Sequence, residues 1–145
     1  MKISTKGRYS LRMLLDLAEH KDKGYISLKD IAKRQGISKK YLEQIVTLFS
    51  NSNMLRTNRG YQGGYMLARE PDQYTVGQIL RTAEGSFSPV ACMEDDPNQC
   101  QRSSFCKTLP VWRGLEKVVN EYLDGITLQT ILDDYKTTGA DEYYI

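Results

Sequence analysis

Apolar residues recur at helical spacing through the first fifty positions and predict three short helices. The first is expected over about residues 6–20, capped by Ser4 or Thr5, with an inner face made by Leu11, Leu14, Leu15 and Ala18. The second begins after Ser27, where Asp30 three residues on completes a capping-box-like pattern. The third runs from Ser38 to roughly residue 50, and its inward positions are Leu42, Ile45, Val46 and Phe49.

The helical pattern gives way to short strands after residue 53. Residues 54–57 and 65–67 are expected to pair on either side of a segment with glycine at positions 60, 63 and 64. Glycine there permits a tight reversal and a close approach of the backbone to a partner. Two short helices around a Gly36-Ile37 turn, followed by such a hairpin, are typical of a winged helix-turn-helix. We therefore predict a mainly α fold with a small β-hairpin, in which residues 1–84 form this domain and about 54–67 its wing.

The second half of the chain predicts three further helices and one irregular stretch. Thr75 caps a helix that turns Val76, Ile79, Leu80 and Ala83 inward, and residues 85–107 then show little periodicity. A longer helix opens at Thr108 or Leu109, and a last one is capped by Thr127, so that residues 108–135 are helical and 136–145 form a tail. The long helix carries a stripe of Val111, Leu115, Val118 and Tyr122, widened by Trp112, Val119 and Leu123. This stripe is broader than a small domain normally leaves exposed, so it meets a second copy or packs within one subunit.

Charge is distributed unevenly along the 145 residues. Residues 1–70 hold 14 Lys and Arg against 6 Asp and Glu, a net +8, whereas residues 71–145 hold 6 against 12, a net −6. A basic first half indicates that this half meets a polyanion, double-stranded DNA above all. Two solvated surfaces that differ by chance are the alternative, and so is a three-helix core that only pairs with protein. The helix-turn-helix pattern favours DNA.

The residues expected to contact DNA lie on the third helix and in the wing. Lys39 and Lys40 stand near the helix N-terminus, where free backbone N–H groups suit phosphates. Gln44 could read adenine, and Glu43 could accept a hydrogen bond from cytosine. Arg59 in the wing is placed to probe the width of a minor groove. The full predicted set is Ser38, Lys39, Lys40, Tyr41, Glu43, Gln44, Arg59, Gly60, Gly63 and Gly64.

All three cysteines fall in the irregular stretch 85–107. Seven residues separate Cys92 from Cys100 and five separate Cys100 from Cys106, unlike the C-x2-C spacing of common zinc sites. The stretch could instead curl around a 2Fe–2S cluster, which takes four protein ligands and chiefly thiolates. A thiol switch is the second possibility, and zinc or inert cysteines are the third.

Three segments carry a resemblance to a known family. MKISTKGRY (residues 1–9), ISKKYLEQ (37–44) and RGYQGGY (59–65) resemble signature segments of the IscR/CymR/NsrR family, the Rrf-two type or BadM-like bacterial winged-helix transcription regulators. The match continues through residues 76–79, the cysteine stretch and residues 126–128, so it covers nearly the whole chain. It implies a homodimer joined by the long helix, operator sites of palindromic character, and a cluster-binding loop formed by Cys92, Cys100 and Cys106.

The resemblance leaves the fourth cluster ligand open. Relatives similar to IscR carry histidine three residues after the last cysteine, where this chain has Leu109, and others use a first-helix position of the partner, which is Arg8 here. Glu94, Asp95 and Asp96 are local carboxylates that could serve instead, while His20 reads as a surface residue at a helix end. Residues 88–90 also resemble the CymR branch of the family. This resemblance implies an alternative: a cluster-free repressor of sulfur and cysteine metabolism that acts through thiol redox or a partner protein.

Several classes of function are disfavoured by composition. With a single histidine, at a helix end, a general base or a Ser-His-Asp arrangement is hard to build, so an enzyme is not expected. The glycines of the hairpin do not follow the strand-to-helix context of a nucleotide-binding loop. No run of about eighteen apolar residues predicts a membrane span, and the first residues lack the apolar centre of a secretory signal, so we expect a cytoplasmic protein.

Overall fold

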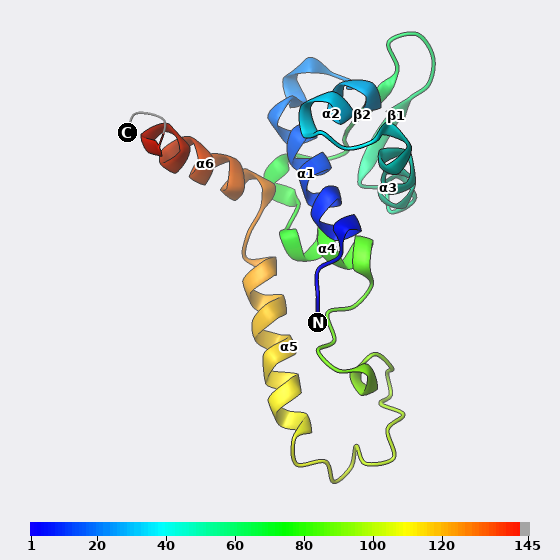
Figure 1. Ribbon diagram of the computed structural model, residues 1–145, viewed down its shortest axis with the longest axis vertical. Helices are drawn as coiled ribbons and strands as arrows, with labels where there is room; N and C mark the ends of the chain where they lie inside the picture. The colour runs from blue at the N-terminus through cyan, green and yellow to red at the C-terminus, as the bar shows by residue number, and fades with distance from the viewer. Residues whose placement is uncertain (143–145) are drawn as a thin grey trace.

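The fold consists of six α-helices and one antiparallel hairpin over residues 1–142, the part of the chain that the computed structural model describes (Figure 1). In chain order the elements are α1 (Thr5–Glu19), α2 (Leu28–Gln35), α3 (Lys39–Asn51), β1 (Leu55–Asn58), β2 (Gly64–Leu67), α4 (Val76–Glu84), α5 (Leu109–Asp124) and α6 (Leu128–Glu142). Short 3-10 turns lie at Lys21–Lys23 (η1), Pro71–Gln73 (η2) and Ala91–Met93 (η3). The predicted mainly α fold with a winged helix-turn-helix is confirmed.

Side-chain caps start the helices where the sequence predicts them. Ser4, Ser27, Ser38 and Thr75 each accept a hydrogen bond from the backbone N–H three residues on, at 3.0–3.2 Å. Gly36, between α2 and α3, adopts the left-handed conformation with φ 64°. Because a residue with a Cβ is strained there, glycine lets the two helices of the motif follow each other so closely.

The last helix is longer than the sequence pattern indicates. It continues through the start of the stretch expected to be a tail, 136–145, and ends at Glu142, while residues 143–145 lie outside the described part. Its first two turns pack, since Leu128 is fully buried and Ile131 and Leu132 are half-buried. Beyond them residues 133–138 are exposed and mostly polar, which explains why apolar periodicity did not reveal where the helix ends.

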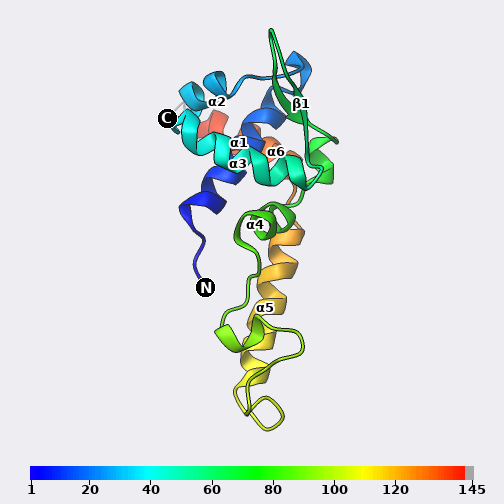
Figure 2. The same cartoon turned by 90° about the vertical axis from the view of Figure 1, so that its right-hand side faces the viewer.

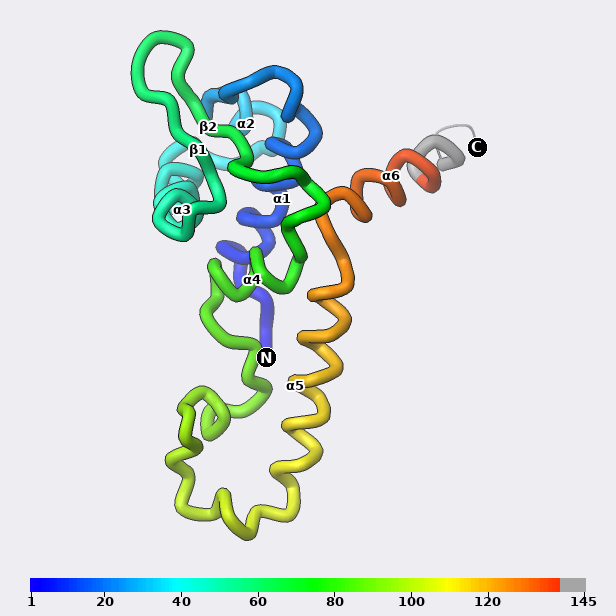
Figure 3. Tube along the Cα trace, turned by 180° about the vertical axis from the view of Figure 1, so that it is seen from behind, coloured from blue at the N-terminus to red at the C-terminus, as the bar shows by residue number. Residues whose placement is uncertain are grey.

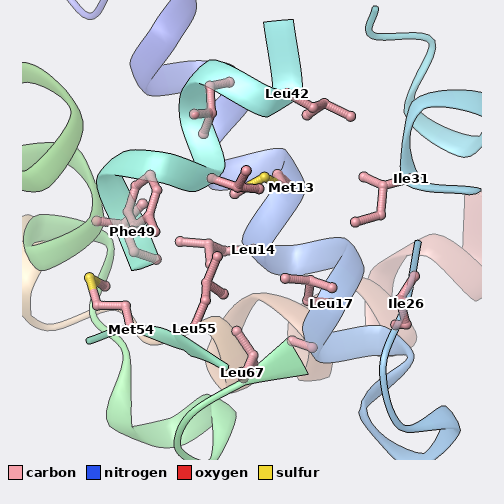
Figure 4. Close-up of a cluster of buried hydrophobic side chains, with 14 of the residues drawn as sticks. Met13, Leu14, Leu17, Ile26, Ile31, Leu42, Phe49, Met54, Leu55 and Leu67 are labelled. Carbon is pink, nitrogen blue, oxygen red and sulfur yellow. The ribbon is translucent and has the colours of Figure 1, made fainter. Parts of the chain in front are cut away.

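The main core lies between α1, α3 and the hairpin (Figure 4). Met13, Leu14 and Leu17 of α1 are fully buried at its centre. Leu42, Ile45 and Phe49 of α3 meet them from one side, so that the opposite face of α3 is left for solvent. Burial of this apolar surface fixes which face of α3 is presented outward.

A smaller core joins α4 to α5. Val76, Leu80 and Phe87 are buried, and partly buried residues that include Val119 and Leu123 pack against them. Gly77 allows this approach, because a Cβ there would collide with the Asp124 carboxylate. Arg81 completes the junction: it donates to Asn120 Oδ1 at 2.9 Å and to Asp124 Oδ1 at 2.6 Å.

The molecule is elongated, with the hairpin and the cysteine stretch at opposite ends. Figures 1 and 2 show α5 running away from the helix-turn-helix, and residues 85–107 forming a long connection from α4 to the far end of α5. Viewed from behind in Figure 3, α6 leaves the body in a different direction from α5. Val111, Leu115, Val118 and Tyr122 of the predicted stripe are exposed in the single chain, with Val118 62% and Tyr122 67% accessible. Val119 and Leu123, which widen the stripe, pack against α4 within the subunit.

No helix within residues 1–142 combines enough length with enough apolar character to cross a lipid bilayer.

Candidate nucleic-acid interface and cysteine loop

The outer face of α3 presents the predicted polar side chains. Lys39, Lys40, Glu43 and Gln44 are all exposed. Ser38 is exposed as well, but its hydroxyl oxygen already accepts the Tyr41 N–H as the helix cap, at 3.1 Å. A hydroxyl can still donate to a phosphate while its oxygen caps a helix. The side chains therefore form a polar, largely basic surface at the start of α3.

Tyr41 is the exception on this surface. It is half-buried, and its ring packs edge-on against Tyr9 of α1, with centroids 5.6 Å apart and planes at 83°. The Arg12 guanidinium lies over the other tyrosine, 5.2 Å from the Tyr9 ring centroid. Tyr41 thus anchors α3 to α1 in addition to bordering the predicted contact surface.

The wing carries two exposed side chains at its tip. Arg59 is exposed as predicted, and Tyr61 is 95% accessible, the most exposed large apolar side chain among those described. The loop turns through Gly60 at φ 118° and Gln62 at φ 59°. Tyr61 lies outside the predicted contact set, although an aromatic residue between glycines with no apolar neighbour to bury it indicates an exposed position.

Gly63 and Gly64 have a reason internal to the chain. A Cβ at Gly63 would collide with the carbonyl oxygen of Asn58, and one at Gly64 with that of Ile26. The close approach of Gly64 to Ile26 lets β2 pair with the segment that precedes α2. Ile26 and Tyr65 exchange two backbone hydrogen bonds of 2.8 Å there. These glycines hold the wing in place, whether or not their backbone also touches DNA.

A groove separates α3 from the wing. Its volume is about 310 Å³, and its walls come from Val46, Thr47, Ser50, Asn51, Thr57, Asn58, Arg59, Gly64 and Tyr65. Most of these side chains are polar, as expected for a hydrated ligand-binding surface and not for a packed core. Asn51, Thr57 and Asn58 are absent from the predicted set because their proximity depends on how the hairpin folds back over α3.

A buried carboxylate holds α2 against α1 behind this surface. Asp16 is 1% exposed; Arg34 donates to both of its oxygens, at 2.7 and 3.0 Å, and Gln35 Nε2 donates at 2.9 Å. The hydrogen bond to Asp16 raises the pKa of Arg34 above its ordinary value. His20 closes α1, with Nδ1–H donating to the Asp16 carbonyl at 2.7 Å, so it is a helix-end residue as expected.

The three cysteines lie on one exposed loop. We call residues 85–107 the cysteine loop; Cys92, Cys100 and Cys106 are free thiols and half-buried. Within the described residues, no three His, Cys, Asp or Glu side chains are close enough together to hold a metal ion. The Thr108 hydroxyl, 3.4 Å from Cys106 Sγ, lowers the pKa of that thiol below its ordinary value.

The donor chemistry of the loop fits three of the four ligands of an iron–sulfur cluster. Thiolates are the preferred ligands of such clusters. The three cysteines lie on a segment that has no regular structure apart from the η3 turn. Leu109 is buried and apolar, so the position three residues after the last cysteine supplies no ligand. The carboxylates of Glu94, Asp95 and Asp96 are exposed on the loop. Arg8 lies on α1, and its guanidinium donates to Thr5 Oγ1 at 3.1 Å.

Comparison with known proteins identifies relatives over most of the chain. The Rrf2 family, described as an iron-dependent transcriptional regulator, matches residues 3–134. The regulator CymR of Bacillus subtilis (strain 168) is 39% identical over 145 residues, which is 100% of this chain and 98% of the relative. IscR of Aliivibrio salmonicida (strain LFI1238) is 36% identical over 134 residues, 92% of this chain and 79% of the relative.

A solved structure shows the same arrangement. The structure of T. potens IscR superposes with a TM-score of 0.74 at 41% identity, over 92% of this chain and 88% of that one. These relatives are transcriptional regulators rather than enzymes, which confirms that expectation. The winged helix-turn-helix, the family profile and the relatives agree, and the chain belongs to the Rrf2 family of transcriptional regulators.

Proposed function

We propose that the protein binds operator DNA as a homodimer, and that a 2Fe–2S cluster held by Cys92, Cys100 and Cys106 changes how it binds. The observation that carries this proposal is the placement of three free thiols on one loop between α4 and α5. One end of that loop follows a helix of the DNA-binding domain, and the other end starts the helix proposed to join two subunits. A ligand that orders the loop would therefore act on both.

The DNA-binding part of the proposal rests on charge and shape. The basic first half of the chain holds the exposed face of α3, and the groove between α3 and the wing is lined mainly by polar side chains. Lys39, Lys40 and the N-terminal N–H groups of α3 would take phosphates, while Glu43 and Gln44 would face base edges. Arg59 and Tyr61 at the wing tip would reach the neighbouring minor groove.

The homodimer rests on apolar surface that one chain leaves uncovered. The stripe on α5 is joined to an apolar groove of about 390 Å³ that Met1, Ile3, Leu80, Val118, Val119, Tyr122 and Leu123 help to line. Monomeric proteins rarely expose continuous apolar surface of this kind. A second copy packed along α5 would cover it, and would place two copies of α3 to read a two-fold symmetric site.

The cluster would supply reversible redox chemistry and sensitivity to oxidants and iron supply. The chain's own part is to offer Cys92, Cys100 and Cys106 as thiolates and to tether the loop to α5, where Ser88 Oγ donates to Glu116 Oε1 at 3.3 Å. The fourth ligand would come from a loop carboxylate, a partner residue or a small molecule. Exchange of that ligand would make the cluster labile, which suits a sensor.

Oxygen-free purification tests the proposal. We expect about two iron and two sulfide per subunit, visible absorbance, and DNA affinity that falls steeply with salt. Removing the cluster with a chelator should then change affinity or sequence preference. Iron and sulfide near zero, in a protein whose DNA binding is insensitive to the cluster-loading treatment, would contradict the cluster and leave only the DNA-binding part.

A cluster-free regulator that acts through thiol redox or a partner protein is the second candidate. It is favoured by the similarity to CymR, which extends over the whole chain, and by the separation of the thiols in the described structure. In that case mild oxidation of iron-free protein should alter DNA binding, and a reductant should restore it. DNA binding that ignores oxidation of the iron-free protein would exclude this thiol mechanism.

A further inference from the structure

One buried hydroxyl group joins both ends of the wing. Tyr74, between η2 and α4, is 0% exposed. Its hydroxyl donates to the Met54 carbonyl at 2.6 Å and accepts from the backbone N–H groups of Ala68 at 3.0 Å and Arg69 at 3.1 Å. Met54 immediately precedes β1, and Ala68 immediately follows β2. The hydroxyl thus uses its donor and both acceptor positions on the base of the hairpin.

The same contacts connect the wing to the recognition helix. The Met54 N–H donates to the Phe49 carbonyl in the last turns of α3 at 3.0 Å, and Asn53 between them takes a left-handed conformation at φ 58°. Only Ser52 and Asn53 thus separate the end of α3 from Met54, whose carbonyl Tyr74 holds. Any shift of this carbonyl would move the wing relative to α3 and change the groove between them.

The backbone around Tyr74 pairs with the segment that connects α5 to α6. Its carbonyl accepts the Leu128 N–H at 3.0 Å, and the Val76 N–H donates to the Ile126 carbonyl at 2.8 Å. Thr75 and Thr127 form an antiparallel bridge between these two bonds. Residues 125–127 connect α5 to α6, so the segment that carries Tyr74 is paired directly to the end of α5.

We propose that Tyr74 is a positioning residue for DNA recognition, which sets the wing relative to α3 and ties that setting to the junction of α5 and α6. It does not touch DNA, since it is buried; it acts through the position of Arg59. The inference rests on the proposed DNA binding through α3 and the wing. It adds the residue through which a displacement of α5 would reach the wing.

Tyr74→Phe isolates the hydroxyl, because phenylalanine keeps the ring in the core. The probe is a duplex selected by the wild-type protein from a random pool, made with either an A-tract or mixed sequence where the wing binds. Arg59→Ala should weaken wild-type binding to the A-tract form about tenfold. In the Tyr74→Phe background we expect Arg59→Ala to weaken binding to the A-tract form about threefold or less. A displaced wing would no longer place Arg59 in the minor groove.

Amide hydrogen exchange gives an independent readout. In Tyr74→Phe the Arg69 N–H should exchange about tenfold faster or more, because its acceptor is gone. The Ala68 N–H should change less, because it also donates to the Met54 carbonyl at 3.3 Å. The Leu128 N–H, whose acceptor is the backbone carbonyl of the same residue, should keep its protection. Arg69→Pro removes one of the two donors and keeps Tyr74; it should reduce the effect of Arg59→Ala in the same direction, and it serves if the phenylalanine variant is unstable.

Ile79→Val is the control for a general loss of stability, because Ile79 is buried in α4 and its change leaves Tyr74 intact. It should lower the melting temperature without altering the effect of Arg59→Ala. The inference is overturned if Arg59→Ala still costs tenfold beside Tyr74→Phe, if Ile79→Val reproduces the loss, or if the Arg69 N–H keeps wild-type exchange. A wild-type protein that selects no duplex would instead refute the proposed function, while the exchange rates would still decide whether Tyr74 holds the wing.

Discussion

Single residues at the start of α3 decide how the protein would meet the phosphate backbone. Lys39 and Lys40 are its first two residues, both exposed, beside N–H groups that no intrahelical carbonyl accepts. Positive charge close to a helix N-terminus gains nothing from the helix dipole, so these side chains are better suited to bind a ligand than to stabilise the helix. A phosphate would be bound by the lysines and by the helix end together.

Lys40→Ala should weaken binding to all duplexes to a similar extent. The slope of log affinity against log salt should become less steep by about one unit, because one phosphate contact is lost. Fluorescence anisotropy across a salt series measures this slope. Lys136→Ala on α6, exposed and remote from α3, is the matched control and should leave it unchanged. An unchanged slope with lost discrimination between duplexes would make Lys40 a base-reading residue instead.

At the scale of elements, the position of α2 depends on a buried charge. Asp16 of α1 accepts three hydrogen bonds from the last two residues of α2, and Arg12 of α1 donates to Gln35 in return. α2 has few buried apolar residues of its own, chiefly Leu28 and Ile31. The ion pair therefore contributes much of what keeps the first helix of the motif in register with the core.

Asp16→Asn should lower the free energy of unfolding by about 2 kcal/mol, less than the roughly 3–5 kcal/mol of a fully buried ion pair, because the Arg34 side chain is partly hydrated. Urea denaturation followed by circular dichroism measures the change. Asp22→Asn in η1, where the carboxylate is exposed, is expected to change the unfolding free energy by less than about 0.5 kcal/mol. Equal effects for the two variants would show that Asp16 is not a special contact.

The cysteine loop is the element that would hold the proposed cluster. Cys100→Ala should abolish iron and sulfide incorporation and leave a folded dimer, because Cys100 is half-buried and belongs to neither core. Iron analysis, sulfide analysis and the melting temperature of the purified variant check this. Ser104→Ala, exposed on the same loop, should keep the wild-type iron content. A Cys100→Ala protein that does not fold would mean that the thiol is structural.

At the scale of the whole molecule, α5 leaves its apolar stripe without a partner. Val118→Asp would bury a charge against a second copy, so dimerisation should weaken by about a hundredfold or more. Sedimentation equilibrium measures the dimer dissociation constant. Glu121 is exposed on the same helix and lies outside the stripe, so Glu121→Gln should leave the dimer dissociation constant unchanged. A wild-type protein that is monomeric at micromolar concentration would refute the dimer.

Much of the fold and some of the candidate site could be predicted from local pattern. Capping residues and helical spacing placed the starts of α2, α3 and α4 to within a residue, because caps and buried faces are decided by neighbours in the sequence. The exposed polar face of α3 followed from its buried face. The groove residues Asn51, Thr57 and Asn58 could not be predicted, since they line one groove only because the hairpin folds back over α3.

The sequence by itself determined the order of elements, the basic first half and the kinds of ligand that the cysteines could hold, because spacing, charge and donor type are properties of the chain. The tertiary structure decided what those properties do. Long-range contacts set the Tyr74 hydroxyl against the Met54 carbonyl, brought Gly64 against Ile26, and left the α5 stripe uncovered within one chain. Such contacts join residues far apart in the sequence, and no local pattern encodes which of them will meet.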